Sequence, residues 1–111
     1  MESILLSIKK KLGPVQEYTY FDEDIIIEIN SAIMALNQIG VGKEGFMVTG
    51  EGETWTDFLE ESYSKMTAVK TYIYIKCRLI FDPPSSSFVV EALKDQLKEY
   101  EFRLNINAES N

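Results

Sequence analysis

Apolar residues recur along this chain at intervals of three and four positions, the spacing that places side chains on one face of an α-helix. The strongest signal lies between residues 62 and 81, where two apolar stripes run side by side and the basic residues fall on the remaining side. One stripe contains Met66, Val69, Ile73, Cys77 and Ile80, and the other contains Tyr72, Ile75 and Leu79. This segment is therefore predicted to be the central helix of the domain, with Cys77 buried.

Three other segments show the same period and are predicted to be helices: residues 3–12, 22–39 and 87–104. In the second of these, Ile26, Ile27 and Met34 widen the apolar line, so we expect that helix to be largely buried. Acidic residues open this helix and three lysines close the first one, as the helix dipole favours. We interpret the lysines as a solvated last turn, with a phosphate contact as the alternative. The apolar lines consist of Ile4, Leu5, Ile8 and Leu12 in the first helix, Ile25, Ile29, Ile33 and Leu36 in the second, and Val89, Leu93, Leu97, Tyr100 and Leu104 in the last.

A loop rich in glycine follows the second helix and is predicted to cover residues 40–54. Residues 40–55 contain five of the six glycines. The GxGxxG spacing within them follows a helix rather than a strand, which argues against a phosphate-binding turn. Because glycine carries the largest backbone entropy, we expect residues 41–53 to be the most mobile internal segment of an isolated subunit. After the loop, Thr54 or Thr56 can cap a short helix that runs through Glu61, with Trp55 as a core anchor or, alternatively, a partner contact.

A rigid corner separates the two C-terminal helices. Asp82 precedes a proline, which disfavours helical geometry, and Pro83 and Pro84 cannot continue a helix. A serine among residues 85–87 can then cap the next helix. These residues predict a structural corner of an αα-hairpin, in which the two flanking helices pack antiparallel.

Taken together, the elements predict an all-α fold in a single domain over residues 1–111. It is a small helical bundle of four main helices plus one short helix, with the glycine-rich loop between the second and third helices. Residues 105–111 form a polar C-terminal tail.

Composition narrows the possible chemistry. The chain has 11 basic and 18 acidic residues, so its net charge is 11 − 18 = −7; such a charge opposes binding to nucleic acid and to anionic membrane surfaces. With no histidine and one cysteine, neither a Ser–His nor a Cys–His pair can form. No apolar run approaches the roughly 20 residues of a membrane span. We predict no catalytic, cofactor-binding or metal site, and synthesis in the cytoplasm.

The second half of the chain carries a recognisable arrangement. An "RLxFDPP" corner follows a tyrosine-rich helix and leads into a long last helix that contains "ExRL". Further matches are "FDEDIIIEIN" at residues 21–30 and "WTDF" at residues 55–58. In these features the chain resembles the head–tail connector proteins of long-tailed bacteriophages, also called adaptor or head-completion proteins, over most of its length. The corner and the last helix contribute Arg78, Leu79, Phe81, Asp82, Pro83, Pro84, Glu101, Arg103 and Leu104 to the resemblance.

The resemblance implies a structural virion protein with no catalysis and no cofactor. Such proteins form a homo-oligomeric ring, dodecameric in the virion, beneath the portal protein at the head–tail interface. The ring presents a platform for the next tail or stopper component. DNA passes through its channel without specific binding, which suits an acidic wall that repels phosphate. The isolated subunit can be a monomer, and assembly takes place in the cytoplasm of the bacterial host, from a phage or a prophage.

Four apolar residues are the candidates for contact with these partners. Phe46 and Val48 belong to the glycine-rich loop and are expected to become ordered against a neighbouring subunit or a tail component. Phe102 and Ile106 remain unused once the inner face of the last helix is assigned. An aromatic residue left outside in this way is a plausible docking anchor.

Two alternative functions stay open. An acidic regulatory module of the antitoxin or anti-activator type would mask a basic partner, and it would bind one-to-one instead of closing a ring. A small metal-dependent hydrolase could use Asp22, Asp24, Glu28 or Glu60, since Glu28 follows Asp24 by four residues on one helix face. Without histidine or a second matched helix motif, a solvated acidic face explains these carboxylates more simply.

Overall fold

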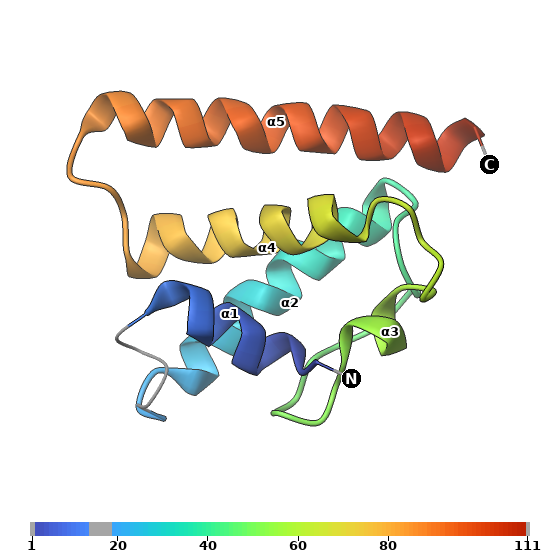
Figure 1. Cartoon of the computed structure of the whole chain (residues 1–111), viewed down its shortest axis with the longest axis horizontal. Coiled ribbons are helices and arrows are strands. Elements are labelled where there is room, and N and C mark those ends of the chain that lie inside the picture. Colours follow the sequence, from blue (N-terminus) through green and yellow to red (C-terminus); the bar gives the residue numbers. More distant parts are fainter. Residues whose placement is uncertain (1, 14–18, 111) are drawn as a thin grey trace.

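The computed structural model describes residues 2–13 and 19–110, with side chains up to residue 105. Within this part the chain forms five α-helices and no strand (Figure 1). The helices are α1 (Ile4–Leu12), α2 (Asp22–Gln38), α3 (Trp55–Phe58), α4 (Met66–Phe81) and α5 (Ser87–Ser110). The predicted all-α fold, with four main helices and one short one, is confirmed.

The central helix is α4, which contacts α1, α2 and α5. Figure 1 shows it between α5 on one side and α1 and α2 on the other. Val69, Ile73 and Cys77 are fully buried, as their stripe predicts. Ile80 belongs to the same predicted stripe but is 57% exposed, whereas the next residue, Phe81, packs partly buried against the core. The helix begins at Met66, four residues later than predicted, since turns precede it.

The helices α1 and α2 bury the apolar lines that the sequence predicts, but Lys9 departs from the prediction of a solvated turn. Its side chain is 3% exposed, and its Nζ lies 2.7 Å from Oδ1 of Asp22. The cause is the meeting of the last turn of α1 with the first turn of α2. A cation at a negative helix end thereby pairs with an anion at a positive one, which favours both charges.

Trp55 holds α3 against α1. Its indole is 1% exposed, and Nε1 donates a hydrogen bond of 2.9 Å to the hydroxyl of Ser7. At the start of α3 the backbone N–H of Thr54 donates to the carboxylate of Asp57 at 2.9 Å. Trp55 is therefore a core anchor and Thr54 the N-terminal cap, although α3 ends three residues earlier than predicted.

The corner between α4 and α5 has the predicted form. Asp82 leaves helical geometry, with φ −153° and ψ 58°, and Pro83 and Pro84 follow it. The hydroxyl of Ser86 accepts a hydrogen bond of 3.5 Å from the N–H of Val89 at the start of α5. Helix α5 then returns along α4 in the antiparallel sense (Figure 1) and runs six residues further than predicted.

Only the second half of α5 reaches the core. Leu104 is 1% exposed, and Leu97 and Tyr100 pack partly buried against the core. Val89 is predicted on the same inner face but is 40% exposed, because the first turns of α5 lie beside the corner, away from α1 and α2. The remaining surface of α5 is open to solvent over most of its described length.

Candidate interaction surfaces

The glycine-rich loop follows a path set by two asparagines of α2. Asn30 donates through Nδ2 to the carbonyl of Val48 at 2.9 Å and accepts through Oδ1 from the N–H of Val48 at 2.7 Å. Two turns later on the same helix, Asn37 donates to the carbonyls of Val41 and Lys43 at 3.0 and 3.2 Å. The mobility expected of residues 41–53 stays a prediction, and opening the loop would have to break these bonds.

The two loop candidates for partner contact pack within their own subunit. Val48 is 1% exposed and belongs to the core. Its predicted role as a partner contact would require a side chain on the surface. Phe46 is partly buried, and its ring centroid lies 5.2 Å from that of Phe58. The physical reason is the pairing with Asn30, which turns Val48 inward. Phe46 keeps part of its surface exposed and remains a candidate.

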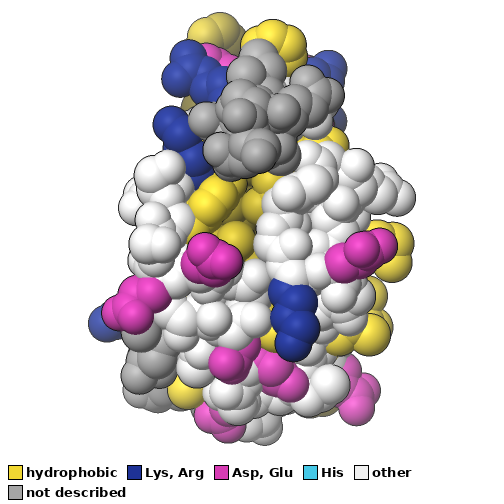
Figure 2. Space-filling model, turned by 90° about the vertical axis from the view of Figure 1, so that its right-hand side faces the viewer, with side chains coloured by type: hydrophobic (Ala, Val, Ile, Leu, Met, Phe, Trp, Pro, Cys, Tyr) yellow, Lys and Arg dark blue, Asp and Glu magenta, His cyan; other side chains and the backbone are white. Residues whose placement is uncertain are grey.

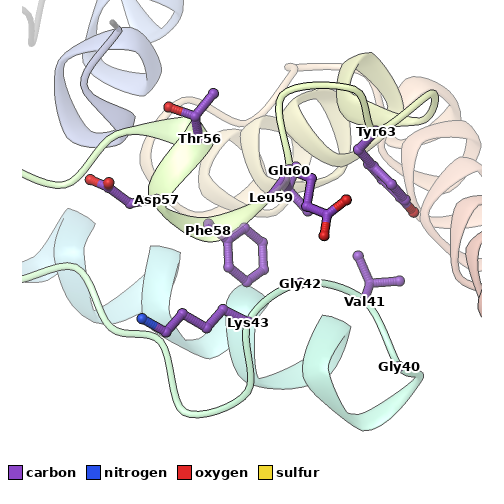
Figure 3. A pocket seen from close by; sticks show the side chains of 10 residues that line it. All are labelled: Gly40, Val41, Gly42, Lys43, Thr56, Asp57, Phe58, Leu59, Glu60 and Tyr63. Atoms are coloured by element: carbon purple, nitrogen blue, oxygen red, sulfur yellow. The ribbon is translucent and has the colours of Figure 1, made fainter.

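A hollow of about 460 Å³ lies between the loop and α3 (Figure 3). Gly42 adopts φ +80°, and a Cβ there would lie 2.3 Å from the ring of Phe58, which points from α3 toward the loop. The N–H of Lys43 donates to the carbonyl of Phe58 at 2.9 Å. Only glycine satisfies both the positive φ and the close approach of the ring, so Gly42 makes the loop fit against α3.

A second, more apolar groove lies between α2 and a later part of the loop. It has a volume of about 500 Å³. Ile27, Met34 and Met47 in its lining are 66%, 63% and 61% exposed. The prediction of a largely buried α2 is therefore wrong for Ile27 and Met34, because no described element covers the outer side of that helix. The groove is lined by Ile27, Asn30, Ser31, Met34, Asn37, Gly45, Phe46 and Met47.

The outer face of α5 presents two phenylalanines. Phe102 is 66% exposed and Phe88 is 82% exposed, and their separation of 14 residues spans about 21 Å of helix. Phe102 points away from the inner stripe, as predicted. The side chain of Ile106 lies outside the described residues. Both phenylalanines are large apolar groups facing solvent, which is the property required of a docking anchor.

Burial raises the pKa of two titratable groups in the core, Cys77 and Tyr72. Burial, with the charge of Glu28 as a smaller cause, raises the pKa of the Cys77 thiol to about 12, so this thiol stays protonated and unreactive at neutral pH. Burial and the hydrogen bond of 2.6 Å that Tyr72 donates to Glu101 raise the pKa of that tyrosine. This bond joins α4 to α5.

The four carboxylates considered for a metal site are not brought together. Among the residues that the structure describes, no group of three His, Cys, Asp or Glu side chains could hold a metal ion. Asp22 is engaged with Lys9, and Glu60 lies at the hollow beside α3. Figure 2 shows acidic side chains at several separate places on one face of the molecule instead of in one cluster.

Comparison with known proteins identifies a matching family. A family model described as "Phage connector protein" matches residues 4–111, which is nearly the whole chain. No curated protein and no solved structure matches the chain significantly. No helix in the described part of the chain is long and apolar enough to cross a membrane.

Proposed function

Because the chain belongs to the phage connector protein family, and so has a structural role in a phage particle, we propose that it forms a ring that joins the portal to the tail. The ring continues the DNA channel from the filled head. The family match over residues 4–111 is the observation that carries this proposal.

The distribution of apolar surface supports assembly. Ile27, Met34 and Met47 are exposed on the α2 side of the subunit, and Phe88 and Phe102 on the α5 side. A ring needs contacts of this kind, in which one face of a subunit meets a different face of the next. We propose Phe102, Phe46 and Ile106 as partner contacts, with the portal or the adjacent subunit as the partner of Phe102.

The charge of the subunit supports a template-dependent assembly. A net charge of −7 makes identical chains repel each other at low salt. The free protein is then a monomer, and the portal drives closure of the ring. Added salt screens the repulsion between subunits and favours the ring.

Sedimentation of the purified protein tests the proposal, with and without the portal protein of the same particle, at about 0.05 and 0.5 M salt. We expect a large assembly with portal, and a larger assembled fraction at high salt. A one-to-one complex with a basic partner and no ring under any condition would instead favour the acidic regulatory module.

A further inference from the structure

The outer side of α2 has the form of a socket for one side chain of another helix. Ile27, Asn30, Ser31 and Met34 all line the groove and stand at positions i, i+3, i+4 and i+7. Four residues with this spacing form the hole that receives a knob in knobs-into-holes packing. The two central residues are shorter than Ile27 and Met34, and Met47 from the loop adds to the wall of the hole.

The polar groups of the socket are largely satisfied within the subunit. Both side-chain amide groups of Asn30 are bonded to Val48, and Asn37 is bonded to the loop through both of its groups. Burying polar atoms without partners is the usual penalty for covering a groove. An apolar side chain placed here would leave few such atoms unpaired. The exposed Ile27, Met34 and Met47 gain burial at the same time.

We propose that this groove receives Phe102 of a second copy of the chain, an inference that rests on the proposed ring. Figure 1 shows α2 and α5 on opposite sides of α4, so the knob and the socket of one subunit face different neighbours. A contact of this type repeats from copy to copy, and it closes into a ring when the rotation between copies allows.

Charge complementarity selects Phe102 and sets the direction of the contact. Lys98 precedes Phe102 by four residues, and Glu23 precedes Ile27 by four residues, so each charge lies about 6 Å along its helix from the apolar residue. With α5 of one copy parallel to α2 of the next and Phe102 at the centre of the hole, Lys98 lies level with Ile27. Glu23 is then about 5 Å further along α2, a distance that the long lysine side chain can span. Phe88 lacks this feature, because Pro84 stands four residues before it. The ion pair sets register more than affinity.

Association measurements on surface variants test the socket under conditions in which the wild type assembles, with portal if required. We expect Phe102→Ala to weaken association about thirtyfold, as for a central anchor residue. Phe88→Ala is the matched control, from the same helix and with a similar exposure, and should change association less than about twofold. Ser31→Phe should fill the hole and act like Phe102→Ala. The melting temperature should hardly change, since all three residues are exposed.

A charge exchange and a cross-link test the register. Lys98→Glu should weaken association, and the double variant Glu23→Lys with Lys98→Glu should restore it. Chains carrying Ser31→Cys, mixed with chains carrying Phe102→Cys, should form covalent dimers on oxidation, and mixtures with Phe88→Cys should not. The native Cys77 does not interfere because it is fully buried.

The outcomes separate the socket from the ring. If the wild type assembles but Phe102→Ala and Phe88→Ala behave alike, or both cysteine mixtures cross-link equally, the socket is wrong and the ring stands. If Ser31→Phe blocks assembly while Phe102→Ala does not, the groove takes a portal or tail segment and the second copy is excluded. If the wild type never assembles, with or without portal, the ring fails and the socket fails with it.

Discussion

The helices α4 and α5 are neighbours in sequence and run antiparallel, yet they differ in how they are buried. Helix α4 buries Val69, Tyr72, Ile73, Ile75 and Cys77, whereas Leu104 is the only fully buried residue among the described side chains of α5. Helix α4 contacts three other helices, and α5 contacts mainly α4. Both helices carry an apolar stripe, so the stripe alone does not determine burial. The number of helices packed around it does.

This contrast divides the molecule into a scaffold and a surface element. The scaffold of α1, α2 and α4 holds the core, and α5 lies over one side of it (Figure 1). An element packed on one side only offers its other side to partners without weakening the core. We therefore expect substitutions in α4 to change stability, and substitutions on the outer face of α5 to change association.

The largest expected effect is at Ile73. Its side chain is fully buried in α4, so Ile73→Ala should lower the free energy of unfolding by about 2–5 kcal/mol through lost burial and a cavity. The matched control is Ile80→Ala in the same helix, where the side chain is 57% exposed and the change should cost less than about 1 kcal/mol. Urea unfolding followed by circular dichroism measures both. Equal losses would mean that the side chain of Ile80 is buried in solution.

A pH dependence of stability should follow from the dry environment of Cys77. Its pKa is raised from 9.0 to about 12 in the folded protein, so the unfolded chain loses this proton first as the pH rises. The stabilisation of the folded state by the protonated thiol is fully present below pH 9 and is lost between about pH 9 and 12. From pH 8 to pH 10 the free energy of unfolding should fall by about 1 kcal/mol from this group.

Urea unfolding at the two pH values measures that fall, and Cys77→Ala is its control. The variant should lose most of the pH dependence, because it has no thiol to titrate. If the free energy of unfolding fell equally in Cys77→Ala, other groups would be the cause. That result would contradict a raised pKa at Cys77.

A smaller effect is expected at the link between scaffold and surface element. Tyr72 donates to Glu101 of α5 at 2.6 Å. Tyr72→Phe keeps the ring and removes this bond, so stability should fall by about 1 kcal/mol, since Glu101 can turn to solvent. Glu101→Gln removes the charge of the acceptor. Once Tyr72→Phe has removed the hydroxyl, there is no bond left for this second change to weaken, so the double variant should cost no more than Tyr72→Phe alone. Strictly additive losses would show that the two groups do not interact in solution.

The smallest effect on stability is expected at Phe88, which is 82% exposed. Phe88→Ala should change the free energy of unfolding by less than about 0.5 kcal/mol. Thermal unfolding by calorimetry measures this, with Leu104→Ala as the buried counterpart on the same helix, where about 2–5 kcal/mol is expected. A large loss at Phe88 would mean that the start of α5 packs against the scaffold after all.

Much of the fold was predictable because it depends on local chemistry. The period of three and four residues located α1, α2, α4 and α5, and the pair Pro83 and Pro84 located the corner. These signals act within a few residues of the chain, so they can be read without the fold. The prolines end α4 wherever the helix lies, because they lack the N–H that a further turn needs.

The candidate site was less predictable. Val48 and Met34 are both apolar, yet one lies in the core and the other faces solvent. No local signal separates them. Val48 is buried because Asn30, 18 residues earlier, bonds to its backbone, and Met34 is exposed because no described helix packs on its side of α2. Lys9 shows the same dependence, since it is buried only where α1 meets Asp22 of α2.

The sequence by itself determined the helices, the corner, the acidic charge and the family to which the chain belongs. Each of these depends on spacing, backbone chemistry or composition, which are properties of neighbouring residues. Tertiary structure alone decided which of the apolar stripes are covered. Burial of a side chain depends on the elements that pack against it from elsewhere in the chain, and three packed on α4 whereas the outer faces of α2 and α5 stayed open. Those open faces are the surfaces that we propose for assembly of the ring.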